Sequence, residues 1–200
     1  MPSVWDLRAR LYNVCEASEL RRGPHKNDLF RDMVGRVLFV ALGTGVDIRR
    51  FPPGRRVVAI DISEEMLRRA KPRQKHYAGE LHFVRADALH LCFRDETFDT
   101  IATSCTLCSV PDPLRALREL RRVLRIDGRL LMFEHVRSRN PILGATLDLM
   151  TLCTRLGGTA MNRDTLAAAV AAGFRITRIE SVYLDIVLAV HAVRAGPPTG

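Results

Sequence analysis

The 200-residue chain lacks any apolar run close to the about 20 residues that a membrane-spanning helix needs. Its N-terminus is polar and has no apolar core of a secretory signal. The five cysteines are an odd number without the spacing of a disulfide framework, which indicates a reducing compartment. The sequence therefore predicts a cytoplasmic protein, either soluble or peripheral on the inner face of the membrane.

Motifs for metals and nucleic acids are also missing. Cys105 and Cys108 form a lone CxxC without a second pair of ligands nearby, so we expect no metal site. No Asp/Asn-Pro-Pro-Tyr-type motif is present, and Ser109–Asp112 offers no aromatic platform for a flipped base. We expect no nucleic-acid partner.

Positive charge is the main excess in the composition. The net charge is +9 and the pI is near 10, but the arginines are spread widely and form no compact tract. Such a balance favours an anionic partner, of which a phospholipid surface, a nucleic acid and an acidic protein are the alternatives. A genome rich in G+C would also enrich arginine, so the charge alone identifies no partner.

Two apolar runs carry the strongest local signal. The first, VLFVALGTG at 37–45, ends in a glycine turn, and the second, VVAIDIS at 57–63, carries Asp61 at its end. This is the layout of a βαβ nucleotide site, in which the carboxylate accepts ribose hydroxyls. No Gly-Lys-Ser/Thr follows, and the third glycine of the dinucleotide fingerprint is missing. A nucleoside without a pyrophosphate fits best, S-adenosylmethionine being the common one; the alternative is a plain turn and an unrelated aspartate.

Apolar runs and helical patterns alternate along the chain, which predicts a doubly wound α/β sheet. A break at Gly23-Pro24 separates two N-terminal helical patterns, and the last two strands are too closely connected for a parallel crossover, so they should form a hairpin. The expected strands are 37–42, 57–62, 81–86, 98–103, 129–133, 174–183 and 186–193. The expected helices lie at 28–33, from 63 to Pro72, from 112 onward, and from 162 or 164 to 170.

Four segments in this order resemble a class I methyltransferase with a seven-stranded Rossmann-like sheet, mostly parallel with a C-terminal antiparallel strand. They are VLFVALGTG (37–45), VVAIDISEEML (57–67), VRADALHLCFRDETFDTI (84–101) and LRELRRVLRIDGRLLMFEHV (117–136). The resemblance implies one methyltransferase domain at 36–195, preceded by a helical lid at 1–35. The pieces EHV (134–136), NRDT (162–165) and CTLCSVPDP (105–113) are similar to the branch with quinone-biosynthesis, phosphatidylethanolamine and membrane-associated thiol methyltransferases.

The resemblance also implies S-adenosylmethionine as cofactor, and S-adenosylhomocysteine as product. The glycine turn would approach the methionine and ribose, Asp61 would hold the ribose hydroxyls, and the residues after the third and fourth strands would contact the adenine and the methyl group. The implied cofactor residues are Ala41, Leu42, Gly43, Thr44, Gly45, Asp61, Ile62, Met66, Asp87, Ala88, Ser104 and Cys105.

Two positions depart from the family pattern. Phe39 stands where the family usually has an acidic residue, and Ala41 stands where it usually has the first glycine. Because the acidic residue normally orders the loop, these changes motivate an alternative of a different class, a non-catalytic cofactor-binding or scaffold protein.

Five residues are candidates for catalysis or acceptor binding. His135 could act as base or acceptor contact, or be an ordinary strand-end histidine. Glu134 could orient His135, attract an ammonium group, or be solvated. Tyr12 could close over the site or simply pack. Cys108 could line the pocket beside the acceptor, and Arg163 could contact a phosphate headgroup or belong to a helix cap.

The N-terminal segment mixes apolar and basic residues, among them Trp5, Leu11, Arg8 and Arg10. This mixture suits a lid helix that also contacts an anionic membrane. The sequence therefore predicts an S-adenosylmethionine-dependent methyltransferase for a small or lipid-like acceptor. A phospholipid amine is the first choice, and a quinone carbon or an alkyl thiol is the alternative.

Overall fold

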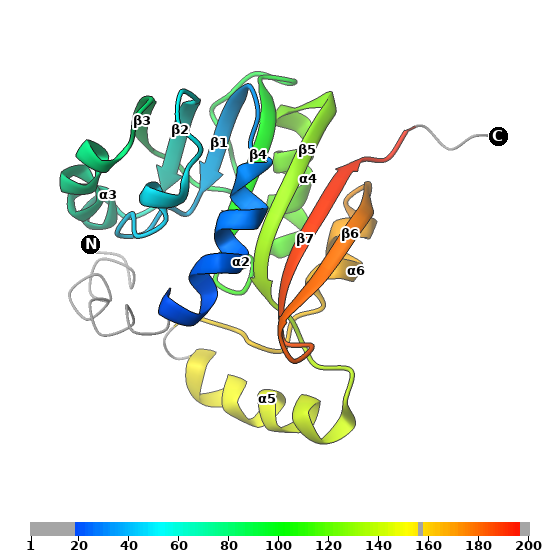
Figure 1. The fold of residues 1–200 in the computed structure, drawn as a ribbon. Coiled ribbons are helices and arrows are strands. Elements are labelled where there is room, and N and C mark those ends of the chain that lie inside the picture. Colours follow the sequence, from blue (N-terminus) through cyan, green and yellow to red (C-terminus); the bar gives the residue numbers. More distant parts are fainter. Residues whose placement is uncertain (1–18, 156–157, 197–200) are drawn as a thin grey trace.

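A computed structural model describes residues 19–155 and 158–196, and within them seven strands form one sheet (Figure 1). The strand order is β3-β2-β1-β4-β5-β7-β6. The strands are β1 (Arg36–Val40), β2 (Arg56–Asp61), β3 (Glu80–Arg85), β4 (Phe98–Ser104), β5 (Leu124–His135), β6 (Phe174–Tyr183) and β7 (Val187–Arg194). All pairs are parallel except those of β7, which runs antiparallel to both β5 and β6. The predicted doubly wound, seven-stranded sheet is confirmed, including its C-terminal hairpin.

Helices cover both faces of the sheet (Figure 1). They are α2 (Glu19–Arg31), α3 (Glu64–Ala70), α4 (Pro113–Val123), α5 (Pro141–Thr154) and α6 (Thr165–Ala171), with short 3-10 turns η2 (Ile48–Arg50) and η3 (Lys71–His76). Side-chain caps begin three of them as the sequence indicates, since Ser63, Asp112 and Asp164 each accept a hydrogen bond from a backbone N–H of the first turn. Of the two starting points expected for the last helix, 162 and 164, the structure uses Asp164 as the residue that caps α6.

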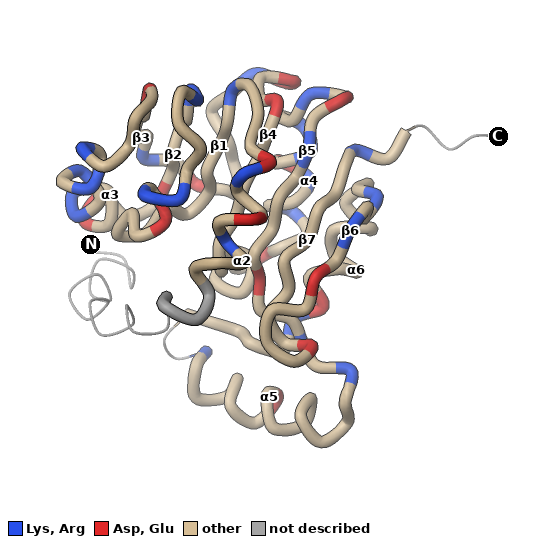
Figure 2. The backbone as a smooth tube through the Cα atoms, viewed as in Figure 1, with Lys and Arg blue, Asp and Glu red and all other residues tan. Residues whose placement is uncertain are grey.

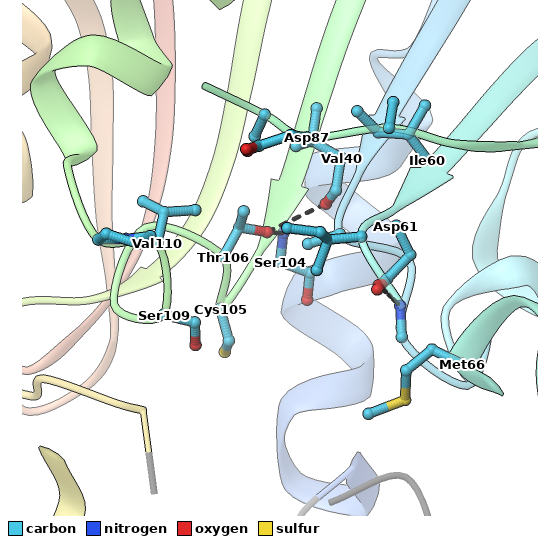
Figure 3. Close-up of a pocket in the computed structure, with 16 residues that line it drawn as sticks. Val40, Ile60, Asp61, Met66, Asp87, Ser104, Cys105, Thr106, Ser109 and Val110 are labelled. Atoms are coloured by element: carbon cyan, nitrogen blue, oxygen red, sulfur yellow. Dashed lines mark hydrogen bonds between the residues drawn. The ribbon is translucent and has the colours of Figure 1, made fainter. Parts of the chain in front are cut away.

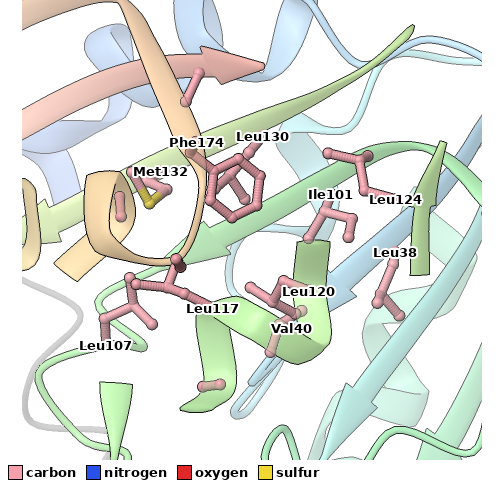
Figure 4. Packing of buried hydrophobic residues seen from close by; sticks show 14 of the residues in the cluster. Leu38, Val40, Ile101, Leu107, Leu117, Leu120, Leu124, Leu130, Met132 and Phe174 are labelled. Atoms are coloured by element: carbon pink, nitrogen blue, oxygen red, sulfur yellow. The ribbon is translucent and has the colours of Figure 1, made fainter. Parts of the chain in front are cut away.

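The core lies on both faces of the central strands. In β1 the four residues from Val37 to Val40 are all buried, as expected for a strand at the centre of a parallel sheet. Leu38 and Val40 face α4 and α6 together with Leu117, Leu120 and Phe174 (Figure 4). The alternate residues of the strand face α2 and α3. The central strands are therefore held from both sides, which fixes the edge where the sheet's carboxyl ends meet.

Two expectations about the helices are wrong. The chain does not break at Gly23-Pro24, because α2 continues through Pro24 with Gly23 packed under Arg50. Helix α5 was not predicted. Its sequence is apolar around almost the whole helix and shows no amphipathic period, although Asn140-Pro141 is a standard helix start, with the Asn140 side chain accepting hydrogen bonds from Ile142 and Leu143.

Strand β5 begins earlier than the expected 129–133. Leu124 pairs with Phe98, but the next pair is Arg129 with Thr100, so residues 125–128 loop out of register. Asp127-Gly128, a pair of residues that favours turns, therefore lies in an irregularity inside the strand. No helix in the described ranges has the length and apolarity needed to cross a membrane.

Candidate active site

A cavity opens at the carboxyl ends of β1, β2 and β4, where the strand order reverses (Figure 3). Its space, including the part open to solvent, is about 770 Å³. Ligands of open α/β sheets bind at this position because the loops on either side of the reversal diverge. The cavity is lined by Val40, Ala41, Gly43, Ile60, Asp61, Ile62, Met66, Ala86, Asp87, Ala88, Ser104, Cys105, Thr106, Ser109, Val110 and Pro111.

The glycine turn after β1 brings backbone to the cavity wall. Ala41, Gly43 and Gly45 have φ angles of 55°, 60° and 80°, a left-handed conformation that glycine adopts without strain. A Cβ on Gly43 would meet nothing within 4 Å, so the wall is open there. A Cβ on Gly45 would lie 2.9 Å from the Cβ of Ala70, so this glycine serves the packing of the turn against α3.

Asp61 is the buried carboxylate of the cavity. It is 7% exposed at the end of β2. One carboxylate oxygen accepts the Gly43 N–H at 2.8 Å and the other accepts the Ser63 N–H at 2.9 Å. These two bonds lock the carboxylate to the glycine turn and to the start of α3. Asp61 also lines the cavity, and a buried carboxylate held in this way suits the role of acceptor for hydroxyl groups of a ligand.

The loop after β4, residues 105–112, forms the opposite wall and is held from below by Glu134. This side chain is 1% exposed and accepts hydrogen bonds from the Thr103 hydroxyl at 2.8 Å and from the Thr106 and Leu107 N–H groups at 3.0 and 3.1 Å. The Thr106 hydroxyl donates to the Val40 carbonyl at 3.0 Å. The buried carboxylate thus replaces the backbone partners that this loop lacks.

Burial raises the pKa of Glu134 to about 7, although its hydrogen-bond donors act in the opposite direction. Three roles were predicted for Glu134, and the one in which its side chain is solvated is wrong, because the side chain is buried. Its observed partners lie in β4 and the loop that follows, so Glu134 fixes the cavity wall.

A family model described as "Methyltransferase domain" matches residues 38–132. A phosphatidylethanolamine N-methyltransferase of Cereibacter sphaeroides is 34% identical over 147 residues, which cover 72% of this chain and 70% of that protein. The chain belongs to the class I S-adenosylmethionine-dependent methyltransferases.

Other relatives of the methyltransferase are quinone enzymes. The ubiquinone/menaquinone biosynthesis C-methyltransferase UbiE of Ectopseudomonas mendocina is 40% identical over 119 residues, 56% of this chain and 46% of that protein. The chain thus spans about half the length of most of the curated relatives it matches. A solved methyltransferase from Thermotoga maritima shares the fold, with a TM-score of 0.70 at 20% identity over 96% of this chain and all of that one.

The cavity of the methyltransferase fits the cofactor that its family and fold imply, S-adenosylmethionine. Asp61 offers buried acceptors for the ribose hydroxyls, and the open wall at Gly43 admits a ligand to the backbone. Ile62, which is 45% exposed although apolar, and the buried Met66 flank the space where the resemblance puts the adenine. Nine of the twelve predicted cofactor residues line the cavity: Ala41, Gly43, Asp61, Ile62, Met66, Asp87, Ala88, Ser104 and Cys105.

The other three predicted cofactor residues lie behind the cavity wall. Leu42 packs in the core, and Thr44 is 3% exposed with its carbonyl accepting a hydrogen bond from Arg73. Gly45 faces Ala70. Of the five residues of the turn, Ala41 and Gly43 alone line the cavity, so proximity in sequence did not place all five against the ligand.

The predicted acceptor residues are not gathered in the cavity. His135 lies at the end of β5 and is not among the lining residues. Cys108 is buried beneath the loop, where its thiol donates to the Cys105 carbonyl, and burial raises the pKa of this thiol to about 12. Arg163 donates to the Leu107 and Val110 carbonyls and so clamps the loop. Tyr12 lies outside the described residues.

Part of the loop after β4 lines the cavity although the sequence did not predict it as part of the site. Thr106, Ser109, Val110 and Pro111 line the cavity, and Ser109 adds a hydroxyl at its mouth (Figure 3). The position of this loop in the chain could have indicated its role, because any loop that leaves the carboxyl end of a strand at the switch point borders the ligand. The sequence of the loop has no periodicity, however, so it does not indicate which of its side chains face the cavity and which face solvent.

Ala41 stands where the family usually has a glycine, and the strain that this alanine causes can be measured. An alanine at φ 55° carries about 1–2 kcal/mol of strain, partly offset by the greater freedom of glycine in the unfolded chain. We expect Ala41→Gly to raise the free energy of unfolding by about 0.5–1 kcal/mol, measured by urea unfolding. Ala167→Gly, on the exposed side of α6, is the control and should lower it by about 1 kcal/mol. An unchanged or lower stability of Ala41→Gly would contradict the strain.

Glu134 predicts a pH dependence of stability. Its pKa is raised from 4.5 to about 7, so between these values the unfolded chain has lost a proton that the folded protein keeps. Its contribution to the free energy of unfolding therefore falls as pH rises from about 4.5 to 7. In Glu134→Gln this contribution disappears. The free energy of unfolding, measured with urea at pH 5 and at pH 7, should therefore decrease less between the two pH values in the variant than in the wild type. Equal slopes in both proteins would contradict the buried, proton-retaining carboxyl.

Proposed function

We propose that this methyltransferase transfers the methyl group of S-adenosylmethionine to the amine of a phospholipid headgroup, as in phosphatidylethanolamine N-methylation. The observation that carries the proposal is the extent of the match to the phosphatidylethanolamine N-methyltransferase, 70% of that protein at 34% identity. The quinone C-methyltransferases are matched over only 46% and 48% of their length. The net charge of +9 supports a phospholipid surface as the place where the acceptor is met.

The polar groups of the cavity support an amine acceptor. The bound cofactor supplies an electrophilic methyl group on a sulfonium sulfur. An amine that has released its proton to solvent would accept the methyl group on its nitrogen lone pair, with S-adenosylhomocysteine as the leaving group, so the protein would have to position the amine rather than create a strong base. Ser104, Cys105 and Ser109 line the wall, and their polar groups can orient the amine by hydrogen bonds.

A carbon acceptor needs more from the protein. A quinol carbon becomes nucleophilic when a base removes a phenolic proton. No histidine is among the described residues that line the cavity, and its carboxylates are those of Asp61 and Asp87, which accept hydrogen bonds from the Gly43, Ser63 and Leu89 N–H groups. Quinone C-methylation is kept as the second candidate because of the several quinone methyltransferases among the relatives, at 36–43% identity.

The test is a comparison of acceptors with radiolabelled S-adenosylmethionine. The protein is incubated with phosphatidylethanolamine vesicles, with demethylmenaquinone kept reduced to the quinol by dithionite in neutral vesicles, or with an alkyl thiol, and the products are separated by chromatography. We expect label in monomethylated phosphatidylethanolamine, and none with Asp61→Ala. Label in menaquinone or in the thioether instead would overturn the amine proposal. Binding of S-adenosylhomocysteine without label in any acceptor would favour the non-catalytic alternative.

A further inference from the structure

Helix α5 lies across the carboxyl edge of the sheet, the edge at which the cavity opens, and leaves one apolar face in solvent (Figure 1). Its inner side is seated on the domain through the buried Gly144, Leu147 and Thr151. A Cβ on Gly144 would lie 3.0 Å from the Ser138 carbonyl, so the seat is close. The helix is therefore fixed on one side and open on the other.

The exposed face is a continuous apolar stripe. The side chains of Ile142, Leu149 and Leu152 are 80%, 68% and 67% exposed. Their spacing puts them on one side of the helix with neighbouring small residues. We call this face the α5 stripe; its members are Ile142, Ala145, Thr146, Leu149, Leu152 and Cys153. It contains no charged residue, and large contiguous apolar faces of this kind mark interaction sites.

An exposed arginine stands at each end of the stripe, and the nearby acids are bound by groups of the protein itself, Asp185 by the Ser138 hydroxyl and the Arg139 N–H (Figure 2). Arg139 precedes the helix and Arg155 follows it, and both are exposed. The one acid of the helix, Asp148, is held by Arg137 at 2.8 Å and by the Asn162 amide at 3.0 Å. An apolar face with arginines at its ends matches a bilayer surface, in which apolar side chains enter the acyl boundary and arginines contact phosphates.

We infer that α5 docks the protein on an anionic phospholipid membrane through the α5 stripe, with Arg139 and Arg155 at the headgroups. Because α5 and the cavity share one edge of the sheet, this docking turns that edge toward the lipid (Figure 1). The inference rests on the proposed function in one respect: docking is useful to the protein because its acceptor is a lipid of that membrane. The docking itself needs neither cofactor nor turnover.

The test measures binding to vesicles of phosphatidylglycerol and phosphatidylcholine, which contain no amine acceptor, by sedimentation without cofactor. We expect the triple substitution Ile142→Gln, Leu149→Gln and Leu152→Gln to weaken binding about tenfold or more, and Arg139→Gln with Arg155→Gln to weaken it severalfold and reduce its salt dependence. Ile126→Gln is the matched control, because Ile126 is 64% exposed at the start of β5, the opposite edge of the sheet. Binding that the triple substitution leaves unchanged would overturn the inference, whatever the acceptor assay shows.

A second measurement reports the position of the helix. The single tryptophan, Trp5, is replaced by phenylalanine and a new one is introduced as Leu149→Trp. Its emission should be that of an exposed indole in buffer and shift to the blue when anionic vesicles are added, with quenching by brominated lipids. Emission that is already blue-shifted in buffer and unaffected by vesicles would mean that another part of the chain or a second copy covers the stripe, and would overturn the inference.

Discussion

Asp61→Ala is expected to weaken the binding of S-adenosylhomocysteine about 100-fold, as measured by calorimetric titration. Hydrogen bonds to a charged group contribute about 1.5–3 kcal/mol each, and the family resemblance implies that this carboxylate accepts the two ribose hydroxyls. A loss of about 2.7 kcal/mol corresponds to this factor. The substitution also removes the acceptor of the Gly43 and Ser63 N–H groups, so the glycine turn loses part of its support.

Asp61→Asn separates these two effects. The amide keeps the size of the side chain and one acceptor oxygen but loses the negative charge, so we expect affinity between those of the wild type and the alanine variant. Thermal unfolding of each variant without ligand shows how much of the loss comes from the turn. Wild-type affinity in an Asp61→Ala protein that folds normally would remove Asp61 from the cofactor site.

Breaking the ion pair between Lys26 and Asp47 is expected to destabilise the protein by about 3–5 kcal/mol. The Lys26 ammonium lies 3.0 and 3.2 Å from the two carboxylate oxygens, and the side chains are only 3% and 7% exposed. Lys26→Met leaves the Asp47 carboxylate in the interior, where the remaining cation among the described ion pairs is Arg50 at 4.0 Å. At about 2–4 °C per kcal/mol for a chain of this size, the melting temperature should fall by about 10 °C.

Two further variants test the cause of this loss. Lys26→Met combined with Asp47→Leu removes both charges and should recover most of the stability, because replacing a whole buried pair by apolar groups is often neutral. Arg31→Met breaks the exposed pair with Asp28 on the same helix, where the side chains are 76% and 61% exposed, and should cost less than about 0.5 kcal/mol. If Lys26→Met with Asp47→Leu is as unstable as Lys26→Met alone, the unpaired Asp47 charge is not the cause of the loss, and Lys26 stabilises the protein through its packing.

The Lys26–Asp47 pair also bears on the missing acidic residue of the glycine motif. Phe39 is fully buried, with its ring 4.8 Å from that of Phe51 and 5.6 Å from that of Phe30. Asp47, just after the glycine turn, ties the turn to α2 instead. The loop of this chain is therefore ordered by an aromatic cluster and a buried ion pair, and Phe39 does not mark a collapsed site.

The N-terminal part of the molecule shows where local sequence signals fail. Gly23-Pro24 indicates a break by itself, but α2 continues because its next turns bury Leu29 and Phe30 against the sheet. Packing of that face outweighs the hydrogen bond that one proline removes. The boundary drawn at residues 35 and 36 stays a prediction, since residues 1–18 lie outside the described part. Within that part, α2 belongs to the same core as β1.

The sheet and the edge that carries the cofactor site could be predicted from the sequence. Strand periodicity, the glycine turn and Asp61 are local features, and the carboxyl ends of parallel strands must meet at one edge. Which residues of each loop face the cavity could not be predicted, because that depends on contacts between distant segments. Glu134 lies 27 or more residues from the loop groups that it holds, and Arg163 lies 53 or more from the carbonyls that it clamps. No sequence period encodes such pairings, so these two candidates for acceptor chemistry proved to be supports of the cavity wall.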